Sequence, residues 1–220
     1  MMTKQLEQVN EQGIHHITTI GAGRQRRADA VVRCPRRHAV DPAICQGCDL
    51  WRGSAGCSLL CASTPAGNVG GPGSVSALMS RDVICILADL DVGSVAWLLS
   101  SKHIGGLPVV DEQRRPHGMI TKSDLLRALG EGRLDGAPFD AFDAFDAFDP
   151  TDDAPPTAWT AAALMSPAVT VSVWDDIEIA ARLFLDKGFR SAPVVDDQDR
   201  LVGVISTLDL LRGLPALAKR

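Results

Sequence analysis

The pattern of apolar and polar positions predicts the same succession of elements twice after residue 75. In the first copy, the apolar run Val83–Leu87 is typical of a short buried strand, and the apolar residues between 92 and 99 fall on one helical face. Two further apolar runs, at 107–110 and 117–120, are separated by a polar turn, and Thr121 opens a last helix. The pattern therefore predicts strand, helix, strand, strand and helix.

A second stretch repeats this pattern 85 residues later, with elements predicted at 169–173, 177–185, 192–195, 201–205 and 208–214. Residues 90–129 and 175–214 align without a gap and are identical at 17 of 40 positions, and the Ala-Leu-Met-Ser at 77–80 recurs at 163–166. Such agreement indicates duplication of one supersecondary unit. Each unit leaves one sheet face to bury, so we expect the two copies to pack together around a pseudo-twofold axis.

The segment between the copies differs from both of them. Residues 139–149 repeat Phe-Asp-Ala with a period of three, which suits neither a strand nor a helix, and Pro150, Pro155 and Pro156 follow. We expect residues 132–157 to form a mobile, acidic, low-complexity linker. Docking of the phenylalanines on a partner or on the repeats is the alternative.

Composition and charge narrow the class of protein. Of the 220 residues, 45% are hydrophobic and 22% are charged, which suits a chain able to bury a core. Residues 1–75 hold eight Lys or Arg against five Asp or Glu, whereas the rest of the chain holds 14 against 22. No apolar stretch approaches the roughly 18 residues that span a bilayer, and the first residues lack an apolar leader. We therefore expect a cytoplasmic protein with no membrane partner.

Three features that occur in the same order in both copies resemble the CBS-domain family. They are the opening Leu-Met-Ser, the Pro-Val-Val-Asp at 108–111 and 193–196, and the ending Gly-h-h-(Thr/Ser)-x-x-Asp-Leu-Leu, where h is apolar. The resemblance implies an α/β fold, a tandem CBS pair, with module 1 at 76–131 and module 2 at 158–216.

The same resemblance implies a ligand and an assembly. Pairs of this family form two clefts that in many members bind AMP, ADP, ATP or S-adenosylmethionine, although some members bind nothing. CBS pairs also join through their helices, so we expect a homodimer. The apolar candidates for its interface are Leu125, Leu126, Leu210 and Leu211.

The ending motif carries the candidate nucleotide site. Thr121 and Ser206 stand at predicted helix N-caps, with Asp124 and Asp209 three residues later, as in a capping box. A helix N-terminus also suits phosphate, and a carboxylate can accept both hydroxyls of a ribose. The residues alone leave capping without a ligand as the alternative.

Just before the proline of each copy the two sequences differ. The second copy has Arg190 and Ser191 where the first has Gly105 and Gly106, positions that face phosphates in some family members. Arg190 can pair with phosphate or lie on the surface, and the Lys102-His103 pair is the substitute in the first copy. We expect the second copy to be the better site. The predicted nucleotide-binding residues are Gly105, Gly106, Thr121, Asp124, Arg190, Ser191, Ser206 and Asp209.

Five of the six cysteines crowd into residues 34–61, whereas Cys85 lies in a predicted strand and is expected in the core. Structural disulfides are disfavoured in a reducing cytoplasm, and the Cys-x-x-Cys at 45–48 lets two thiolates share one tetrahedral zinc. We predict a flexible segment at 1–29 and a zinc knuckle at 30–66, with strands at 30–35 and 57–61. Free thiols, a redox pair and an iron–sulfur cluster are the alternatives. The expected ligands are Cys34, Cys45, Cys48 and Cys61, with Cys57 or His38 as substitutes.

These features favour a regulatory protein. The leading hypothesis is a sensor in which an adenine nucleotide enters the clefts and changes how the pair contacts a protein partner. The alternative is a nucleic-acid-binding or transcription-linked protein whose basic, cysteine-rich N-terminus docks on DNA or RNA. The sequence has no Gly-rich phosphate loop, no nucleophile motif and no paired carboxylates outside the capping positions, so we expect no enzymatic activity.

Overall fold

The first repeat folds into the predicted succession of elements. The computed structural model describes residues 10–22, 26–34, 38–40, 51–55, 58–61, 73–134 and 159–217. A short helix that the sequence did not predict precedes the first repeat's strands, and the other elements match the predicted order. They are α2 (Val75–Leu78), β6 (Val83–Leu87), α3 (Val92–Ser101), β7 (Gly106–Val110), β8 (Pro116–Thr121) and α4 (Lys122–Gly130).

The second repeat has the same order, with an additional two-residue strand after its short helix and a shorter strand before α6. The predicted strand at 169–173 is reduced to two residues, and the carboxylate of Asp175 accepts the N–H of Ser172 at 2.8 Å. The elements are α5 (Ala161–Leu164), β9 (Ser166–Pro167), β10 (Val171–Ser172), α6 (Ile177–Lys187), β11 (Ser191–Val195), β12 (Leu201–Ser206) and α7 (Thr207–Leu217).

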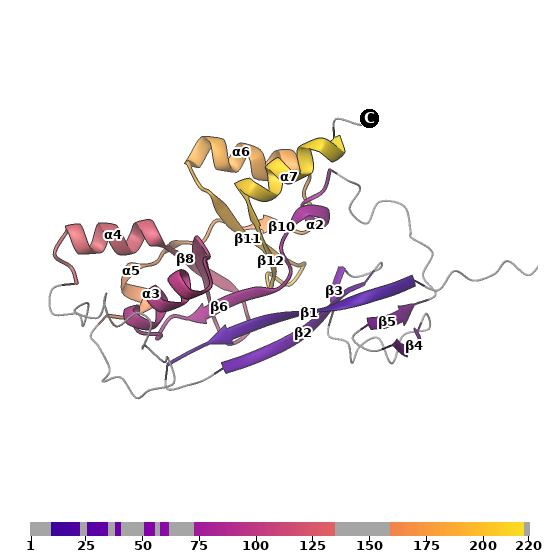
Figure 1. Cartoon of the computed structure of the whole chain (residues 1–220), viewed down its shortest axis with the longest axis horizontal. Coiled ribbons are helices and arrows are strands. Elements are labelled where there is room, and N and C mark those ends of the chain that lie inside the picture. The colour runs from indigo at the N-terminus through magenta and orange to yellow at the C-terminus, as the bar shows by residue number, and fades with distance from the viewer. Residues whose placement is uncertain are drawn as a thin grey trace, which may run out of the picture.

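The two repeats exchange their opening segments. Ser80 of the first repeat and Val204 on β12 of the second exchange two backbone hydrogen bonds of 2.9 Å. Reciprocally, β9 of the second repeat pairs antiparallel with β8 of the first. Each repeat is therefore completed by the other, as expected for an intertwined pair, and Figure 1 shows α2 lying beside α7.

This exchange explains the glycine of the ending motif. A Cβ at Gly118 would lie 2.6 Å from the sulfur of Met165 and 2.9 Å from the carbonyl oxygen of Ser166. A Cβ at Gly203 would meet Met79 and Ser80 at the same two distances. The opening Leu-Met-Ser of one repeat thus packs against the motif glycine of the other.

In the part of the chain that the structure describes, three groups of buried apolar residues form the interior. One fills the first repeat and takes in Ala161 and Leu164 from α5, and another fills the second repeat and takes in Val75 and Met79. The third lies between the repeats, and it includes the buried Cys85, which confirms the expectation of a core cysteine. Its buried members are Ile17, Val83, Cys85, Val110 and Leu201.

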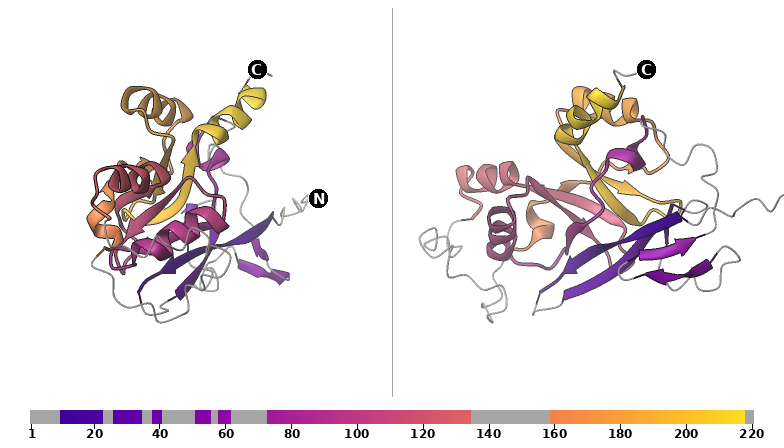
Figure 2. Two further views of the ribbon diagram at one scale, coloured as in Figure 1. Left: turned by 60° about the vertical axis from the view of Figure 1, so that its left-hand side comes forward. Right: turned by 45° about the vertical axis from the view of Figure 1, so that its right-hand side comes forward.

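The N-terminal strands extend the sheet of the first repeat. Strand β1 (Asn10–Ile20) runs parallel to β6, with Ile17 opposite Val83, so the sheet has the order β3-β2-β1-β6-β7-β8-β9. Figures 1 and 2 show β1 and β2 on the side of the molecule away from α6 and α7. The other N-terminal strands are β2 (Arg26–Cys34), β3 (His38–Val40), β4 (Trp51–Ala55) and β5 (Ser58–Cys61).

Strand β1 corrects the expected flexible segment at 1–29. Residues 17–20 are all β-branched, which suits a strand. Ile17 is fully buried, and the Oγ1 of Thr19 lies 3.4 Å from the sulfur of Cys85. The predicted strands near 30–35 and 57–61 are present as β2 and β5, and β5 pairs with the start of β1. The N-terminal part is therefore joined to the first repeat through β1.

The predicted linker begins too early. Leu134, which the prediction placed in the linker, is 3% exposed and belongs to the core of the first repeat. The side chain of Arg133 donates a hydrogen bond of 2.7 Å to the carbonyl oxygen of Ala163. Both contacts arise because α5 of the second repeat packs on the first. The Phe-Asp-Ala repeat lies outside the described residues. Among the described helices, none is both long and apolar enough to cross a membrane.

Candidate functional site

The predicted nucleotide-binding residues gather at two strand–helix junctions. In the first junction, which comprises residues 105–106 and 121–124, the pairing of β7 with β8 places Gly106 opposite Thr121. In the second junction, residues 190–191 and 206–209, the pairing of β11 with β12 places Ser191 opposite Ser206. Each predicted set of four residues is thus brought together, at equivalent places in the two repeats.

A capping box closes both junctions, as the sequence predicted. The hydroxyl of Thr121 accepts the N–H of Asp124 at 3.3 Å, and the Oδ2 of Asp124 accepts the N–H and hydroxyl of Thr121 at 2.9 and 2.6 Å. In the second junction the corresponding distances between Ser206 and Asp209 are 3.4, 2.8 and 2.6 Å. These bonds fix the first turn of α4 and of α7.

The Oδ1 atoms of Asp124 and Asp209, which the caps do not use, have different surroundings in the two junctions. Both aspartates are 8% exposed. The Oδ1 of Asp124 lies 3.4 Å from the hydroxyl of Ser166 and 3.4 Å from Arg127. Within the part of the chain that the structure describes, the Oδ1 of Asp209 has only an ion pair with Arg212, at 3.7 Å. The second junction therefore has the carboxylate oxygen with more free acceptor capacity.

The residues before the two prolines differ in the space around them. A Cβ at Gly106 would lie 3.0 Å from the methyl of Thr121 and 3.2 Å from the carbonyl oxygen of Ile120, so this position is tightly packed. Ser206 has no such methyl, and Ser191 stands opposite it. Gly105 is different, because a Cβ there would meet nothing within 4 Å.

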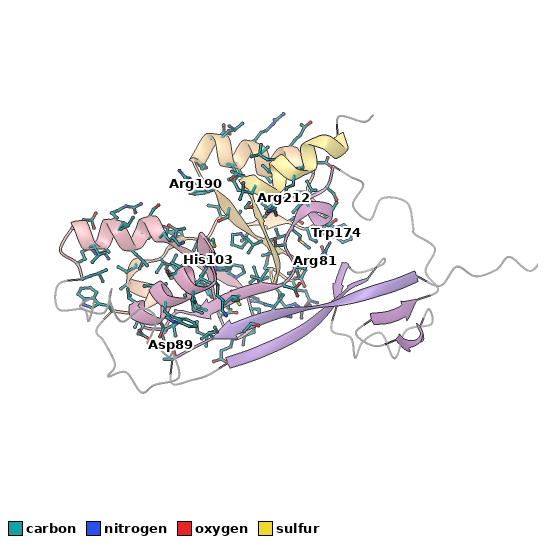
Figure 3. All side chains as sticks on the ribbon, viewed as in Figure 1. Arg81, Asp89, His103, Trp174, Arg190 and Arg212 are labelled. Carbon is teal, nitrogen blue, oxygen red and sulfur yellow. The ribbon has the colours of Figure 1, made fainter. Side chains whose placement is uncertain are left out.

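The cations near the junctions also differ. Arg190 is exposed where α6 leads into β11, and it has no ion pair with any described residue (Figure 3). Lys102, expected as a substitute in the first repeat, places its ammonium 5.9 Å from the ring centre of Trp97 on its own helix. His103 has a φ of 53°, the left-handed conformation that Gly188 adopts after α6. Lys122, which follows Thr121, is a further exposed cation at the first junction, and its N–H reaches the carbonyl oxygen of Gly105 at 3.4 Å.

The predicted metal ligands are only partly within the described residues. Cys34 ends β2 and pairs in register with His38 on β3, and Cys61 ends β5 and pairs with Trp51. Among the residues that the structure describes, no group of three or more potential ligands is close enough to hold a metal ion. Cys45, Cys48 and Cys57 lie outside the described residues.

Comparison with known proteins gives this architecture a family. The family model of the CBS domain matches residues 75–131 and 161–216. The chain belongs to the CBS-domain family. The crystal structure of the CBS-pair protein CBSX2 of Arabidopsis thaliana in complex with AMP superimposes with a TM-score of 0.51 at 26% identity, covering 67% of this chain and 99% of that one. The CBS pair of protein MJ0100, in complex with 5′-methylthioadenosine and S-adenosyl-L-methionine, has the same fold, with a TM-score of 0.51 at 21% identity over 66% of this chain and 97% of that one.

Sequence relatives cover the same region. An uncharacterised protein of Methanopyrus kandleri is 28% identical over 146 residues, which are 66% of this chain and 64% of that protein. The chloroplastic CBS domain-containing protein CBSX1 of Arabidopsis thaliana is 28% identical over 139 residues, which are 60% of this chain and 59% of that protein. The match therefore spans slightly less than two thirds of the length of these relatives.

Proposed function

We propose that this CBS pair is a non-catalytic sensor of an adenine nucleotide, with its stronger site at the second junction. The observation that carries the proposal is the backbone contact of Arg190 with Thr207, at 3.0 Å, which places this arginine at the start of the helix that holds the capped Asp209, and Arg190 has no ion pair with any described residue. The AMP complex of the structurally similar CBSX2 supports the choice of ligand. Binding would change the surface that the pair offers to a protein partner.

The chemistry of the second junction fits the parts of an adenosine phosphate. The Oδ2 of Asp209 is used by the cap, and its Oδ1 is available to accept the hydroxyls of a ribose. The guanidinium of Arg190 offers planar, charge-assisted hydrogen bonds to a phosphate. The positive end of α7 adds to the attraction for an anion.

Calorimetric titration with ATP, AMP and adenosine tests this assignment. Arg190→Ala should weaken ATP more than adenosine, because only the phosphates lose a partner. Asp209→Ala should weaken both by about 1.5 to 3 kcal/mol, the range for hydrogen bonds to a charged group. Ser206→Ala is the matched control, since it removes the cap hydroxyl but keeps the carboxylate, and it should change affinity less.

The outcomes separate the hypotheses. Equal losses of ATP and adenosine in Arg190→Ala would contradict the role of that arginine. Absence of binding to the wild-type chain would contradict the sensor. Retention on DNA with a steep dependence on salt, without nucleotide binding, would favour the nucleic-acid alternative.

A homodimer joined through helices is the proposed assembly. Leu126 on α4 and Leu211 on α7 are 66% and 59% exposed, so they are available for an interface. Leu125 is buried and Leu210 packs against the core, which removes them from the expected set. Light scattering at micromolar concentration should give twice the chain mass of 23.4 kDa, and the mass of a single chain would contradict the dimer.

Zinc binding by the cysteine-rich segment is also proposed, with His38 as the favoured substitute ligand. The proposed ligands are Cys34, Cys45 and Cys48 with Cys61 or Cys57 as the fourth, and because His38 stands opposite Cys34 in register, His38 is the favoured substitute for the fourth ligand. Purified protein should carry about one zinc per chain, and changing both Cys45 and Cys48 to serine should release it. Metal-free protein after purification without chelators would contradict this proposal.

A further inference from the structure

The two repeats also meet through the turns that precede β8 and β12. The N–H of Leu201 donates a hydrogen bond of 2.8 Å to the carbonyl oxygen of Arg114, which joins the second repeat to the first. At the repeat offset of 85, the equivalent bond would run from residue 116 to the carbonyl oxygen of Asp199. Residue 116 is a proline, which has no N–H, so this second bond cannot form.

The backbone of the turns does not account for the missing bond. Arg114 and Asp199 occupy equivalent places and have φ values of 65° and 58°, so both turns have the same left-handed residue before the strand. Pro116 and Leu201 are likewise both paired in their own sheets, opposite Val110 and Val195. The contact between the turns is therefore half of a symmetric pair because of one residue type.

The side chains beside this contact are equally unequal. Leu201 is fully buried together with Ile17 of β1 and with Val83, which is 6% exposed. The equivalent residues on the other side of the pseudo-twofold axis are Pro116, which is half-buried, and Val169, which is 37% exposed. Among the described strands, none pairs with the outer edge of β10 as β1 pairs with β6. Strand β1 thus covers one side of the axis.

Strand β1 contacts both repeats at once. Its residues 17–20 pair in parallel with residues 83–86 of β6, and the Oγ1 of Thr19 lies 3.4 Å from the sulfur of Cys85. Its Ile17 lies in the same apolar group as Leu201 of the second repeat. Burial of Ile17 therefore favours the arrangement in which the two turns are in contact.

We infer that β1 is a lock on the relative orientation of the two repeats, and that the contact between the turns opens when β1 is released. The exchanged opening segments keep the pair together in both states, through the bonds between Ser80 and Val204 and the pairing of β8 with β9. Because Pro116 leaves the turns a single hydrogen bond, their contact depends on the apolar group that Ile17 completes. The two candidate junctions belong to different repeats, so the lock also sets how they are placed relative to each other.

Hydrogen exchange of the Leu201 amide reports this opening without any ligand. Its N–H bonds to the other repeat, so it becomes free when the turns separate. The amide of Val173 is the internal control, because it bonds to the carbonyl oxygen of Val195 within the second repeat at 2.9 Å. Local opening accelerates exchange at Leu201 and leaves Val173 protected, whereas unfolding of the second repeat accelerates both.

Replacement of Ile17 tests the lock in the full chain. In Ile17→Ala, exchange of the Leu201 amide, measured by NMR, should accelerate about tenfold more than that of Val173. Ile17→Val is the matched control, since it keeps most of the apolar side chain, and its excess acceleration at Leu201 should stay below threefold. Equal acceleration of the two amides in Ile17→Ala would show that β1 merely stabilises the whole chain, which overturns the inference.

Replacement of Pro116 tests the same contact from the other repeat, and it decides the matter even if Ile17→Ala does not fold. Pro116→Ala supplies an N–H opposite the carbonyl oxygen of Asp199. Exchange at Leu201 should then slow about fivefold relative to Val173, the effect of one added hydrogen bond. Pro116→Ala combined with Ile17→Val should cancel the acceleration caused by Ile17→Val. Unchanged exchange at Leu201 in Pro116→Ala would overturn the opening of the turn contact.

Discussion

The two repeats agree at their centres and differ at the outer edges of their sheets. Both have a capping box after the last strand and a motif glycine that receives a methionine of the other repeat. The first repeat, however, has its outer strand β6 paired with β1. In the second repeat the equivalent strand β10 has only two residues, and the side chain of Asp175 takes its N–H at Ser172.

The two repeats therefore cover the outer edges of their sheets in different ways. An open sheet edge exposes unpaired backbone groups and must be covered or closed. The second repeat closes its edge with one local side chain, whereas the first uses its edge to attach the N-terminal strands. Ile17 of β1 also belongs to the apolar group between the two repeats. A change in the relative position of the repeats would therefore be felt by the N-terminal strands.

Removal of the Ile17 side chain should have the largest effect on stability. This residue is fully buried among Val83, Cys85, Val110 and Leu201. Ile17→Ala should lower the free energy of unfolding by about 3 kcal/mol, as expected for a large-to-small change in a core, and Ile17→Val by about 1 kcal/mol. Urea unfolding measures both. A loss below 0.5 kcal/mol in Ile17→Ala would show that β1 is not a structural part of the first repeat.

Substitution of the two motif glycines should affect both repeats equally. The new Cβ in Gly118→Ala or Gly203→Ala would meet a methionine sulfur and a backbone carbonyl oxygen, and the carbonyl cannot move away as a side chain can. Each variant should lose about 2 kcal/mol by overpacking. Gly105→Ala is the matched control and should be neutral, since its Cβ meets nothing within 4 Å. Unequal losses in thermal or urea unfolding would show that the exchanged segments contribute differently to the two repeats.

The duplicated elements could be predicted from the sequence because their signals are local. The apolar run at 83–87 and the motif at 118–124 carry strand and cap patterns that do not depend on distant residues. The duplication also places the pairs Gly106–Thr121 and Ser191–Ser206 at equivalent positions in the two repeats. The order of the elements therefore followed from pattern and spacing, whereas the pair fold and the choice of candidate site residues also drew on the resemblance to the CBS-domain family.

What the sequence did not reveal depends on contacts between distant segments. The role of β1 required its pairing with β6, and a run of β-branched residues at 17–20 gave only a weak local signal. The exchange of Met79 and Met165 between repeats could not be read from either copy alone.

The turns that join β7 to β8 and β11 to β12 differ between the two repeats, and we expect the smallest effect on stability there. In the first repeat, the Oδ1 of Asp111 accepts the N–H groups of Gln113 and Arg115 at 2.9 and 2.8 Å, and His117 lies 3.4 Å from its Oδ2. In the second repeat, Asp196 accepts the same two backbone bonds and a two-pronged contact from Arg200 at 3.2 and 3.1 Å. Arg200 keeps its charge at all accessible pH values, whereas His117 is charged only when it is protonated. The contact of Arg200 with Asp196 therefore does not depend on protonation of the basic partner.

Acid should remove the contribution of the Asp111 carboxylate to the free energy of unfolding. Burial raises the pKa of its carboxyl, but the backbone hydrogen bonds from Arg115 and Gln113 and the contact with His117 outweigh it, so the pKa lies below the usual 3.8. A lowered folded-state pKa means that the stabilisation is complete above the unfolded value of about 3.9 and is lost as the pH falls through the folded value. Asp111→Asn should cost about 0.5 to 1 kcal/mol at pH 7, and this difference from the wild type should shrink between pH 4 and pH 2. Urea unfolding across that range measures it, with Asp199→Asn as a control in the other turn. A difference that stayed constant with pH would show that the asparagine disturbs the turn for a reason other than charge.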